Sequence, residues 1–304
     1  KSVRVNVHKP LVNNVITLLS GLADTTICNG ADPRIFKGSQ PSGGTNIAGD
    51  YAYEWQYSTD NAAWNAISTS GTGRDYDPPS LNVTTYFRRK VLSGACIDIS
   101  AATLKVEVLP LITNNTVNDP AEICKDAVPA LITATSPAGG DGSYIYYWEQ
   151  SIDGGSTWTG AAGVNNDPSG NYQPPALSVP TKYKRRVTSG AGNCCTSVSN
   201  IIEVQLHTLP TTPAYAGEND IAYSPFKDYT LEANKPNELI GEVGEWFSIL
   251  GSSDFQNRNL PKTKVYGLED SNIFVWKITN GPCISLDTIE IKYIINNHQE
   301  ICNR

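Results

Sequence analysis

Cysteine is the residue type whose spacing in this sequence most clearly predicts chemistry. Of the 7 cysteines among 304 residues, two pairs occupy matching places in two similar segments: Cys28 with Cys96, and Cys124 with Cys195. Each pair would join an early strand to the start of a closing strand, around a core tryptophan, Trp55 or Trp148, on a strand between them. The pattern therefore predicts two disulfides, Cys28 to Cys96 and Cys124 to Cys195, and disulfides indicate an oxidising compartment.

A neighbouring cysteine leaves one of these pairings open. Cys194 directly precedes Cys195, and the C-x-x-[V/I]-S pattern shared with the first segment favours Cys195 as the bonded residue. A zinc site is the alternative to disulfides. It is disfavoured because the sequence has no C-x-x-C pair and only 3 His.

A third, divergent segment keeps only the late cysteine. Cys283 holds that place, whereas Ala222 or Tyr223 stands where the early cysteine would be. We expect Cys283 to be an unpaired buried thiol, with a bond to another chain as the alternative. Cys302 is expected to pair with a residue beyond the end of the chain.

The histidines do not form a catalytic group. His8, His207 and His298 fall near the joints between segments, far from one another along the chain. A Ser-His-Asp triad needs its members within hydrogen-bond reach. We interpret the histidines as solvated linker residues, and we predict no catalytic residue in this chain.

Carboxylates and amides cluster at predicted turns. Asp75 and Asp77 have the residue type of a glycosidase pair, but the matching stretch Gly170–Gln173 has no carboxylate, which favours a turn. The run Asn165–Asp167 is a weak candidate for calcium, without EF-hand spacing. Apart from this weak calcium alternative, we predict no cofactor and no metal.

Two further patterns are interpreted as structural. Ser151–Trp158 matches the S-x-D-x-G-x-x-W "Asp-box" of sialidase-type propellers, in which Asp153 would accept backbone N–H bonds, so it predicts a turn fastener. The runs Arg88–Lys90 and Lys184–Arg186 lie within predicted strands, where alternate side chains face opposite sides. Their default interpretation is a solvated sheet face paired with carboxylates.

An aromatic row marks one predicted strand. Tyr51, Tyr53, Trp55 and Tyr57 alternate with other residues, as is typical of a buried strand face. Members of the row near the strand ends are candidates to stack on sugars or on a protein partner.

The elements that must position these residues are short strands. Charged residues make up 17%, hydrophobic residues 39%, and there are 25 Gly and 19 Pro, a composition that suits a β-rich protein and disfavours a helical bundle or disorder. The net charge of −7, without a basic stripe, disfavours nucleic acid as a partner. No apolar run approaches the roughly 20 residues that span a bilayer.

Internal repeats organise these strands. Three stretches of the first segment recur in the same order in the second: Tyr51–Ser58 as Tyr144–Ser151, Pro78–Leu81 as Pro174–Leu177, and Thr85–Gly94 as Thr181–Gly190. The third segment carries Trp246 and Trp276 and ends on the alternating stretch Cys283–Ile291. Each segment of about 90–100 residues has room for about seven strands, which predicts an immunoglobulin-like β-sandwich.

The predicted fold class is therefore all-β, a tandem array of immunoglobulin-like β-sandwich domains. We expect residues 1–8 to close a preceding repeat, 9–109 and 110–209 to be Ig-like repeats 1 and 2, 210–296 to be a PKD-like or Ig-like repeat 3, and 297–304 to start a following repeat. Two alternatives remain for Val3–Val7: it belongs to the first domain, or it adds a strand to a neighbouring chain's sheet.

A specific family pattern runs through the first two repeats. The pattern Y-x-W-Q/E-x-S-x-D…W…Y-x-P-P-x-L, continued by T-x-Y/F-R/K-R-x-V…S-G…C, resembles Ig-like repeats in large surface and secreted proteins of Bacteroidota. Gliding-motility adhesins and other cargo of the type IX secretion system are among these proteins. The third repeat, from Gly244 to Cys283, is similar to PKD-like modules of the same proteins and departs by lacking the early cysteine.

This resemblance implies a non-catalytic, extracellular structural or adhesive segment: a stalk, an adhesin or a surface-fibre component. The implied partners are other domains of the same chain, and possible ones are glycans, surface proteins or neighbouring fibre subunits, without membrane insertion of this segment. Thr25 and Thr288 fit the short Asp-Ser/Thr O-glycosylation motif of Bacteroidota. The alternatives are a glycan- or protein-binding module, or an accessory region of a secreted enzyme whose catalytic domain lies elsewhere.

Overall fold

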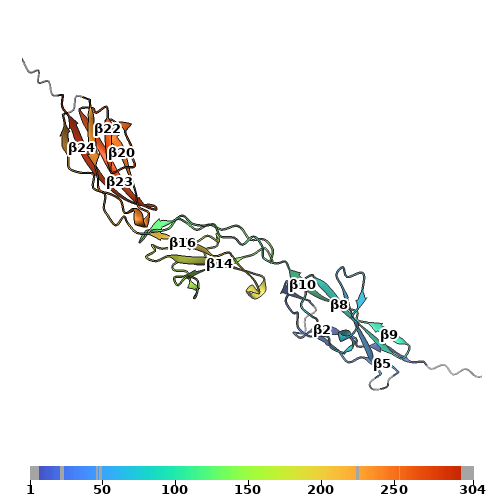
Figure 1. Cartoon of the computed structure of the whole chain (residues 1–304). Helices are drawn as coiled ribbons and strands as arrows, with labels where there is room; N and C mark the ends of the chain where they lie inside the picture. Colours follow the sequence, from blue (N-terminus) through green and yellow to red (C-terminus); the bar gives the residue numbers. More distant parts are fainter. Residues whose placement is uncertain are drawn as a thin grey trace, which may run out of the picture.

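The molecule is a rod of three β-sheet units placed end to end (Figure 1). The computed structural model describes residues 7–20, 24–45, 47, 50–223, 226–252 and 254–295. The chain exposes 17680 Å², whereas a compact protein of this mass exposes about 12,500 Å². The elongated shape follows from three separate cores, and the predicted all-β tandem fold is confirmed.

Unit 1 is built around the long central strand β8. Its main sheet has the order β3-β10-β8-β6-β7 with β9 also beside β8, and the pairs β2-β4 and β1-β5 complete it. Its elements are β1 (Lys9–Val12), β2 (Ile16–Leu18), β3 (Asp24–Cys28), β4 (Phe36–Gly38), β5 (Ser42–Gly44), β6 (Ala52–Ser58), β7 (Asn65–Ala66), the 3-10 helix η1 (Ser70–Thr72), β8 (Thr85–Ser93), β9 (Cys96–Ile99) and β10 (Leu104–Leu109).

Unit 2 repeats this plan around β14. Its sheet has the order β13-β12-β14-β15, with β16 also beside β14 and a separate pair β11-β17. Its elements are β11 (Ile123–Cys124), β12 (Ile145–Ser151), β13 (Thr159–Gly160), β14 (Thr181–Ser189), η2 (Ala191–Asn193), β15 (Cys195–Val198), β16 (Ile202–Val204) and β17 (Leu206–His207). Isolated bridges such as that between Ile132 and Tyr172 hold the facing layer.

Unit 3 has two regular sheets, ordered β18-β24-β23-β20 and β19-β22-β21. Its elements are β18 (Asp220–Ala222), β19 (Asp228–Glu232), η3 (Glu238–Ile240), β20 (Val243–Leu250), β21 (Asp254–Phe255), β22 (Lys262–Tyr266), β23 (Ser271–Asn280) and β24 (Cys283–Tyr293). Trp246 and Trp276 are fully buried, with ring centroids 5.1 Å apart.

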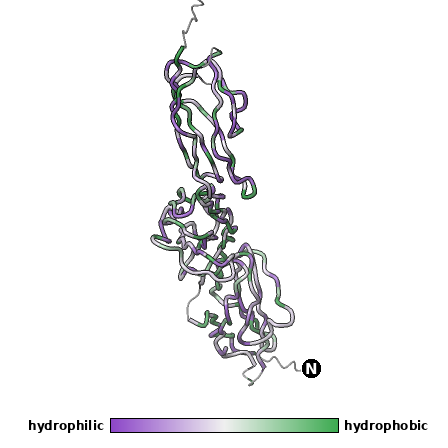
Figure 2. The backbone as a smooth tube through the Cα atoms, turned by 60° about the vertical axis from the view of Figure 1, so that its left-hand side comes forward, coloured by the Kyte–Doolittle hydropathy of each residue, from purple (hydrophilic) through white to green (hydrophobic). Residues whose placement is uncertain are grey.

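A tryptophan also anchors each of the first two cores. Trp55 and Trp148 are fully buried, and their indole N–H groups donate to the carbonyls of Gly73 and Gly170 at 3.1 and 3.3 Å. Buried and exposed positions alternate along β8 and β14, as expected for strands with one face in a core. Figure 2 shows the result as hydrophobic and hydrophilic stretches interspersed along every unit.

The arginine runs differ from the default interpretation as a solvated sheet face paired with carboxylates. Arg89 and Arg185 are buried on the inner faces of β8 and β14. Arg89 donates to the Asn14 side chain and to the carbonyls of Arg74 and Ser39, at 2.8 to 2.9 Å. The interpretation as solvated residues is thus wrong for these two arginines. Carbonyl and amide oxygens, rather than carboxylates, satisfy the buried guanidinium of Arg89.

Candidate functional site: disulfide joints between the units

The early and late cysteines of one unit lie at opposite ends of that unit. Strand β3 runs parallel to β10, so Cys28 lies opposite Leu109 at the end of the unit's last strand. Cys96 instead follows the hairpin after Ser93, and β8 between the two ends is 9 residues long, roughly 26 Å at about 3.3 Å per residue. A disulfide needs Cα atoms within about 7 Å. The predicted bond between Cys28 and Cys96 is therefore wrong.

The first joint connects unit 1 to unit 2. Cys28 is bonded to Cys195, the first residue of β15, with a Cα–Cα distance of 5.3 Å. The end of unit 1 meets the turn of the long hairpin of unit 2. A Cβ at Gly190 in this turn would lie 2.9 Å from the Leu109 side chain. Cys195 is the bonded residue of the Cys194–Cys195 pair, as the sequence pattern favours, but its partner belongs to the preceding unit.

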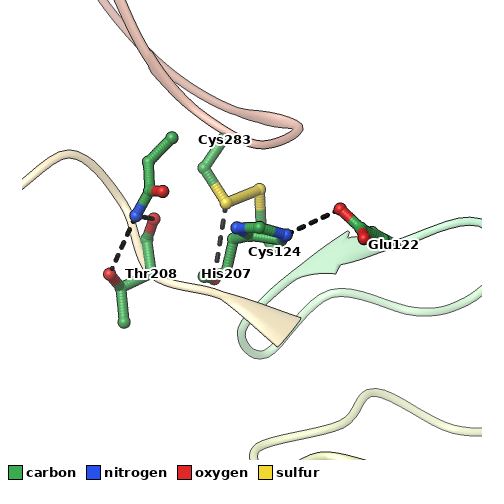
Figure 3. Close-up of a disulfide and its surroundings, with 6 residues drawn as sticks. Glu122, Cys124, His207, Thr208 and Cys283 are labelled. Carbon is green, nitrogen blue, oxygen red and sulfur yellow. Dashed lines mark hydrogen bonds and ion pairs between the residues drawn. A yellow bond between two sulfur atoms is a disulfide. The ribbon is translucent and has the colours of Figure 1, made fainter. Parts of the chain in front are cut away.

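The second joint repeats the first between units 2 and 3. Cys124, which lies opposite His207 at the end of β17, is bonded to Cys283, the first residue of β24, with a Cα–Cα distance of 5.4 Å (Figure 3). The predicted bond between Cys124 and Cys195 is thus wrong. The prediction of an unpaired thiol at Cys283 is also wrong, although this residue is fully buried.

His207 lies inside the second joint rather than in free solvent. Its Nε2 is 2.7 Å from a carboxylate oxygen of Glu122, and its carbonyl oxygen is 3.4 Å from the Cys283 sulfur (Figure 3). The solvated-linker interpretation therefore fails for His207. His8 is exposed, and His298 lies outside the described residues.

A glycine makes this close approach possible. Gly281 has φ of 55°, and a Cβ there would meet ring atoms of His207 at 2.6 Å. Both the left-handed backbone and the lack of space require glycine at this position. The hairpin before Cys283 can therefore lie directly against the last strand of unit 2.

Polar contacts fasten the linker beside this disulfide. The Asn280 side-chain amide donates to the Thr208 carbonyl at 3.1 Å, and the Thr211 hydroxyl donates to the buried Glu242 carboxylate at 2.9 Å. Burial opposes ionisation of Glu242, yet the N–H groups of Asn237 and Thr211 keep its pKa below the usual value. Unit 3 thus holds the linker as well as the disulfide.

Three cysteines are not part of these two disulfides. Cys96 is a half-buried free thiol whose sulfur lies 3.8 Å from the Lys9 carbonyl oxygen. Cys194 is an exposed free thiol. Cys302 lies outside the described residues.

Sequence reasoning missed the offset between units, although a signal was present. Cys283 has no early partner in its own unit, since Ala222 ends β18 at the place that Cys28 and Cys124 hold in β3 and β11. If the early cysteine of each unit pairs with the late cysteine of the next unit, Cys283 gains a partner. This pairing also agrees with the parallel arrangement of the first and last strands within a unit, which brings the early cysteine to the end of that unit nearest the next one.

The other candidate groups serve turns and strands. Asp75 accepts from Gly38 N–H at 3.0 Å and pairs with Lys37 at 2.9 Å, instead of facing Asp77 as a reactive pair. Asp153 accepts from Thr157 N–H and hydroxyl at 2.9 and 2.6 Å, which keeps its pKa far below the usual value. The Asp-box is therefore a turn fastener, as predicted.

A pocket of about 540 Å³ opens on unit 1. It is lined by residues that include Tyr57, Ile67, Tyr76 and Pro79. Tyr57 ends the aromatic row and is 39% exposed, whereas Trp55 in the same row is fully buried. The end of the row thus faces a hollow large enough for a sugar residue.

The candidate glycosylation sites differ in exposure. Thr288 is exposed on β24, and Thr25 is half-buried on β3. Among the described residues, no helix is long and apolar enough to cross a membrane.

Known proteins resemble the chain in two ways. A family model described as "Domain of unknown function (DUF8696)" matches residues 20–110 and again 113–208, together more than half of the chain. No curated protein is similar to it in sequence.

Solved structures of multi-domain proteins align over most of the length. Extracellular domains 3–5 of Drosophila OTK show 11% identity over 94% of this chain and 99% of that one, with a TM-score of 0.38. A titin I-band fragment shows 12% identity over 89% and 95%, with a TM-score of 0.40. The FN1–FN3 domains of chicken CNTN1 show 13% identity over 85% and 93%, with a TM-score of 0.33.

Proposed function

Since this chain belongs to the family of domains of unknown function DUF8696, which occurs in it twice in tandem, we propose that it is a non-catalytic, extracellular structural segment of a longer repeat protein. One observation carries this proposal: both disulfides connect successive units, Cys28 to Cys195 and Cys124 to Cys283. Disulfides persist in oxidising surroundings, which supports a location outside the cytosol. The segment acts as a covalently stiffened stalk.

The joint geometry explains how such a stalk resists bending and extension. A flexible linker would leave two sandwiches free to pivot, because inter-domain contacts are normally weak. Here each joint has the peptide linker and, in addition, a disulfide between the last strand pair of one unit and the hairpin of the next. Two covalent connections per joint restrict rotation about either one alone.

The position of Cys96 supports a further repeat on the N-terminal side. The second strand of the long hairpin in each unit begins at a cysteine: Cys96, Cys195 and Cys283. The latter two accept the early cysteine of the preceding unit. By the same rule we propose that Cys96 accepts the early cysteine of a preceding repeat.

The finer identity rests on the sequence resemblance. Under this proposal the segment belongs to a Bacteroidota surface protein, of the gliding-adhesin type exported by the type IX system, with units 1 and 2 as Ig-like repeats and unit 3 as a PKD-like repeat. Exposed Thr288 is the favoured O-glycosylation site. Intact mass of the protein from its native cell surface tests the glycan, since no excess mass contradicts it.

Small-angle X-ray scattering tests the stalk. We expect the natural chain in oxidising buffer to show one well-defined maximum dimension. The distribution of interatomic distances should broaden when the substitutions Cys28→Ala and Cys124→Ala open both joints. The matched control is Cys96→Ala, which removes a thiol outside both joints and should leave the curve unchanged. Identical curves for all three proteins would contradict a stiffening role.

A glycan-binding role for unit 1 is the second candidate. The observation that favours it is the pocket of about 540 Å³ beside the exposed Tyr57 ring. Aromatic rings at such sites stack on sugars. A glycan array should then show binding that Tyr57→Ala abolishes and Tyr147→Ala, an exposed tyrosine of unit 2, leaves intact; no binding by the intact chain would leave the stalk alone.

A further inference from the structure

Three sulfur atoms meet at the joint between units 1 and 2. The Cys194 sulfur lies 2.7 Å from the Cys28 sulfur and 3.8 Å from the Cys195 sulfur. All three lie within 4.8 Å of one another. Cys194 is an exposed free thiol, so a potential nucleophile is in contact with both atoms of a disulfide.

The additional thiol comes from a loop that is longer only in unit 2. Gly94 and Ala95 separate β8 from β9, and Gly281 and Pro282 separate β23 from β24. In unit 2 the connection runs from Gly190 to Cys194. Cys194 therefore belongs to an insertion that the other joint lacks.

The backbone of this insertion forms a tight turn just before Cys194. Gly190, Gly192 and Asn193 all have positive φ, between 57° and 82°. Glycine and asparagine adopt this region most readily. A Cβ placed on Gly192 would meet no atom within 4 Å, so the loop has open space at Gly192, although Gly190 at its start lies against Leu109.

We propose that Cys194 undergoes thiol–disulfide exchange with the joint, so that Cys28 alternates between Cys195 and Cys194 as its partner. The Cys194 thiolate attacks the Cys28 sulfur, a bond forms between them, and the bond from Cys28 to Cys195 breaks. Cys195 leaves as a thiolate and takes up the proton that Cys194 released. One thiol and one disulfide stand on each side of the reaction, so neither an oxidant nor a reductant is needed.

Metal binding is a poorer explanation for the same cluster. Metal ions bind cysteine as the thiolate. Two of the three sulfurs are joined in the disulfide, which leaves Cys194 as a single thiolate donor. Thiol–disulfide exchange needs one thiol beside one disulfide, which is the arrangement present here.

Exchange has a consequence for the stalk, and this consequence rests on the proposed function. When a small thiol such as glutathione attacks the bond at Cys28 and releases Cys195, Cys194 can displace it from Cys28 and restore a covalent joint. Cys194 thus gives the first joint a second thiol, besides the released Cys195, that can restore the covalent connection. The second joint, between Cys124 and Cys283, has no third thiol among the described residues.

Disulfide isomers of the intact chain test the proposal. The oxidised protein is quenched in acid, denatured, alkylated with N-ethylmaleimide at acidic pH and fragmented by mass spectrometry. We expect two isomers within about tenfold of each other, because both are unremarkable bonds to the same sulfur: one with the label on Cys194 and one with the label on Cys195. The second joint, as internal control, should give a single bond between Cys124 and Cys283.

Two variants separate exchange from the joint itself. Cys195→Ser should form the bond from Cys28 to Cys194, and Cys194→Ser should keep the bond from Cys28 to Cys195 but accumulate a mixed disulfide with added glutathione. A single isomer in the natural chain, with Cys28 fully alkylated in Cys195→Ser, would overturn exchange and leave the stalk intact. Full alkylation of Cys28 in both variants would overturn the stalk as well.

Discussion

Buried arginine is the residue-scale feature that ties each of the first two sandwiches together. Arg185 in unit 2 repeats the contacts of Arg89 in unit 1, donating to the side chain of Asn115 and to the carbonyls of Gly170 and Thr135, at 2.8 to 3.0 Å. Burial lowers the pKa of both arginines from the ordinary value. A guanidinium stays charged after such a shift, so it supplies hydrogen-bond donors to the loop carbonyls around it.

Replacing one of these arginines should therefore destabilise its unit. Arg89→Met keeps much of the side-chain volume but leaves the carbonyls of Ser39 and Arg74 without a donor, at a cost of about 3 kcal/mol. Urea unfolding followed by tryptophan fluorescence measures this loss. Arg88→Met is the matched control, because Arg88 is only half-buried and should cost under about 1 kcal/mol. Equal losses in the two variants would contradict the assigned role.

A buried carboxylate gives the unit 2 to unit 3 linker a dependence on pH. The pKa of Glu242 is lowered in the folded chain, so its contribution is present above the unfolded value of about 4.3 and disappears as the pH falls through the folded value. We expect Glu242→Gln to lose about 1–2 kcal/mol at pH 7, and the difference from the natural chain to shrink below about pH 4.

Urea unfolding at a series of pH values measures this difference. Exposed Glu238 on η3 provides the control, since Glu238→Gln should change the stability little at any pH. If the difference in free energy of unfolding between Glu242→Gln and the natural chain stayed constant from pH 7 to pH 3, the carboxylate charge would play no part.

At the scale of elements, the long hairpins of units 2 and 3 are the parts that dock onto the preceding unit. In unit 3 the hairpin connects β23 to β24, and Gly281 at its tip lies against His207. Because Cys283 is the first residue of β24, the turn before it fixes the direction of its side chain. Small changes at the tip should therefore affect the disulfide more than the sandwich.

Gly281→Ala should slow formation of the second joint. The new Cβ would overlap the His207 ring, and alanine disfavours φ of 55°. Refolding from the reduced state, with N-ethylmaleimide added at intervals, reports how fast Cys124 and Cys283 become bonded, and we expect at least about a tenfold delay for a penalty of about 1.4 kcal/mol.

Gly241→Ala is the matched control for this delay. Gly241 has φ of 82°, but a Cβ there meets no atom within 4 Å. It carries the same kind of backbone penalty without touching the joint. Equal rates for the natural chain and Gly281→Ala would show that the contact with His207 does not guide the pairing.

Strands and cores could be predicted from the sequence because they depend on local patterns. The alternation along β8 and β14 and the tryptophans at Trp55 and Trp148 identify the buried faces directly. The cysteine partners could not be read in the same way. They depend on which end of a unit a strand reaches, and that is a property of the parallel pairing of β3 with β10, which no local pattern reports.

The buried arginines illustrate the same limit. Alternation places Arg89 on the face shared with Phe87 and Val91, but residue type argues for solvent. The oxygens that satisfy Arg89 come from segments before and between the strands, including Asn14 and Ser39. Tertiary structure brings these oxygens close to Arg89. A prediction from the charge of arginine alone therefore places its side chain on the wrong side of the sheet.

At the scale of the whole molecule, the chain is a row of sandwiches in which one covalent rule applies at each described joint. The early cysteine of a unit is bonded to the late cysteine of the next, from Cys28 to Cys195 and from Cys124 to Cys283. Both disulfides lie between successive units of the rod in Figure 1, and the proposed stalk function depends on this rule. Bonds within a unit would instead leave each joint with a single peptide linker.

Non-reducing peptide mapping of the intact protein tests this rule most directly. Free thiols are first blocked with N-ethylmaleimide, and the disulfide-linked peptides are then sequenced by mass spectrometry. The account predicts peptides that join Cys124 to Cys283, and Cys28 to the Cys194–Cys195 pair, with none joining Cys28 to Cys96. Peptides that join Cys28 to Cys96 and Cys124 to Cys195 would contradict it, because each bond would then close within one unit.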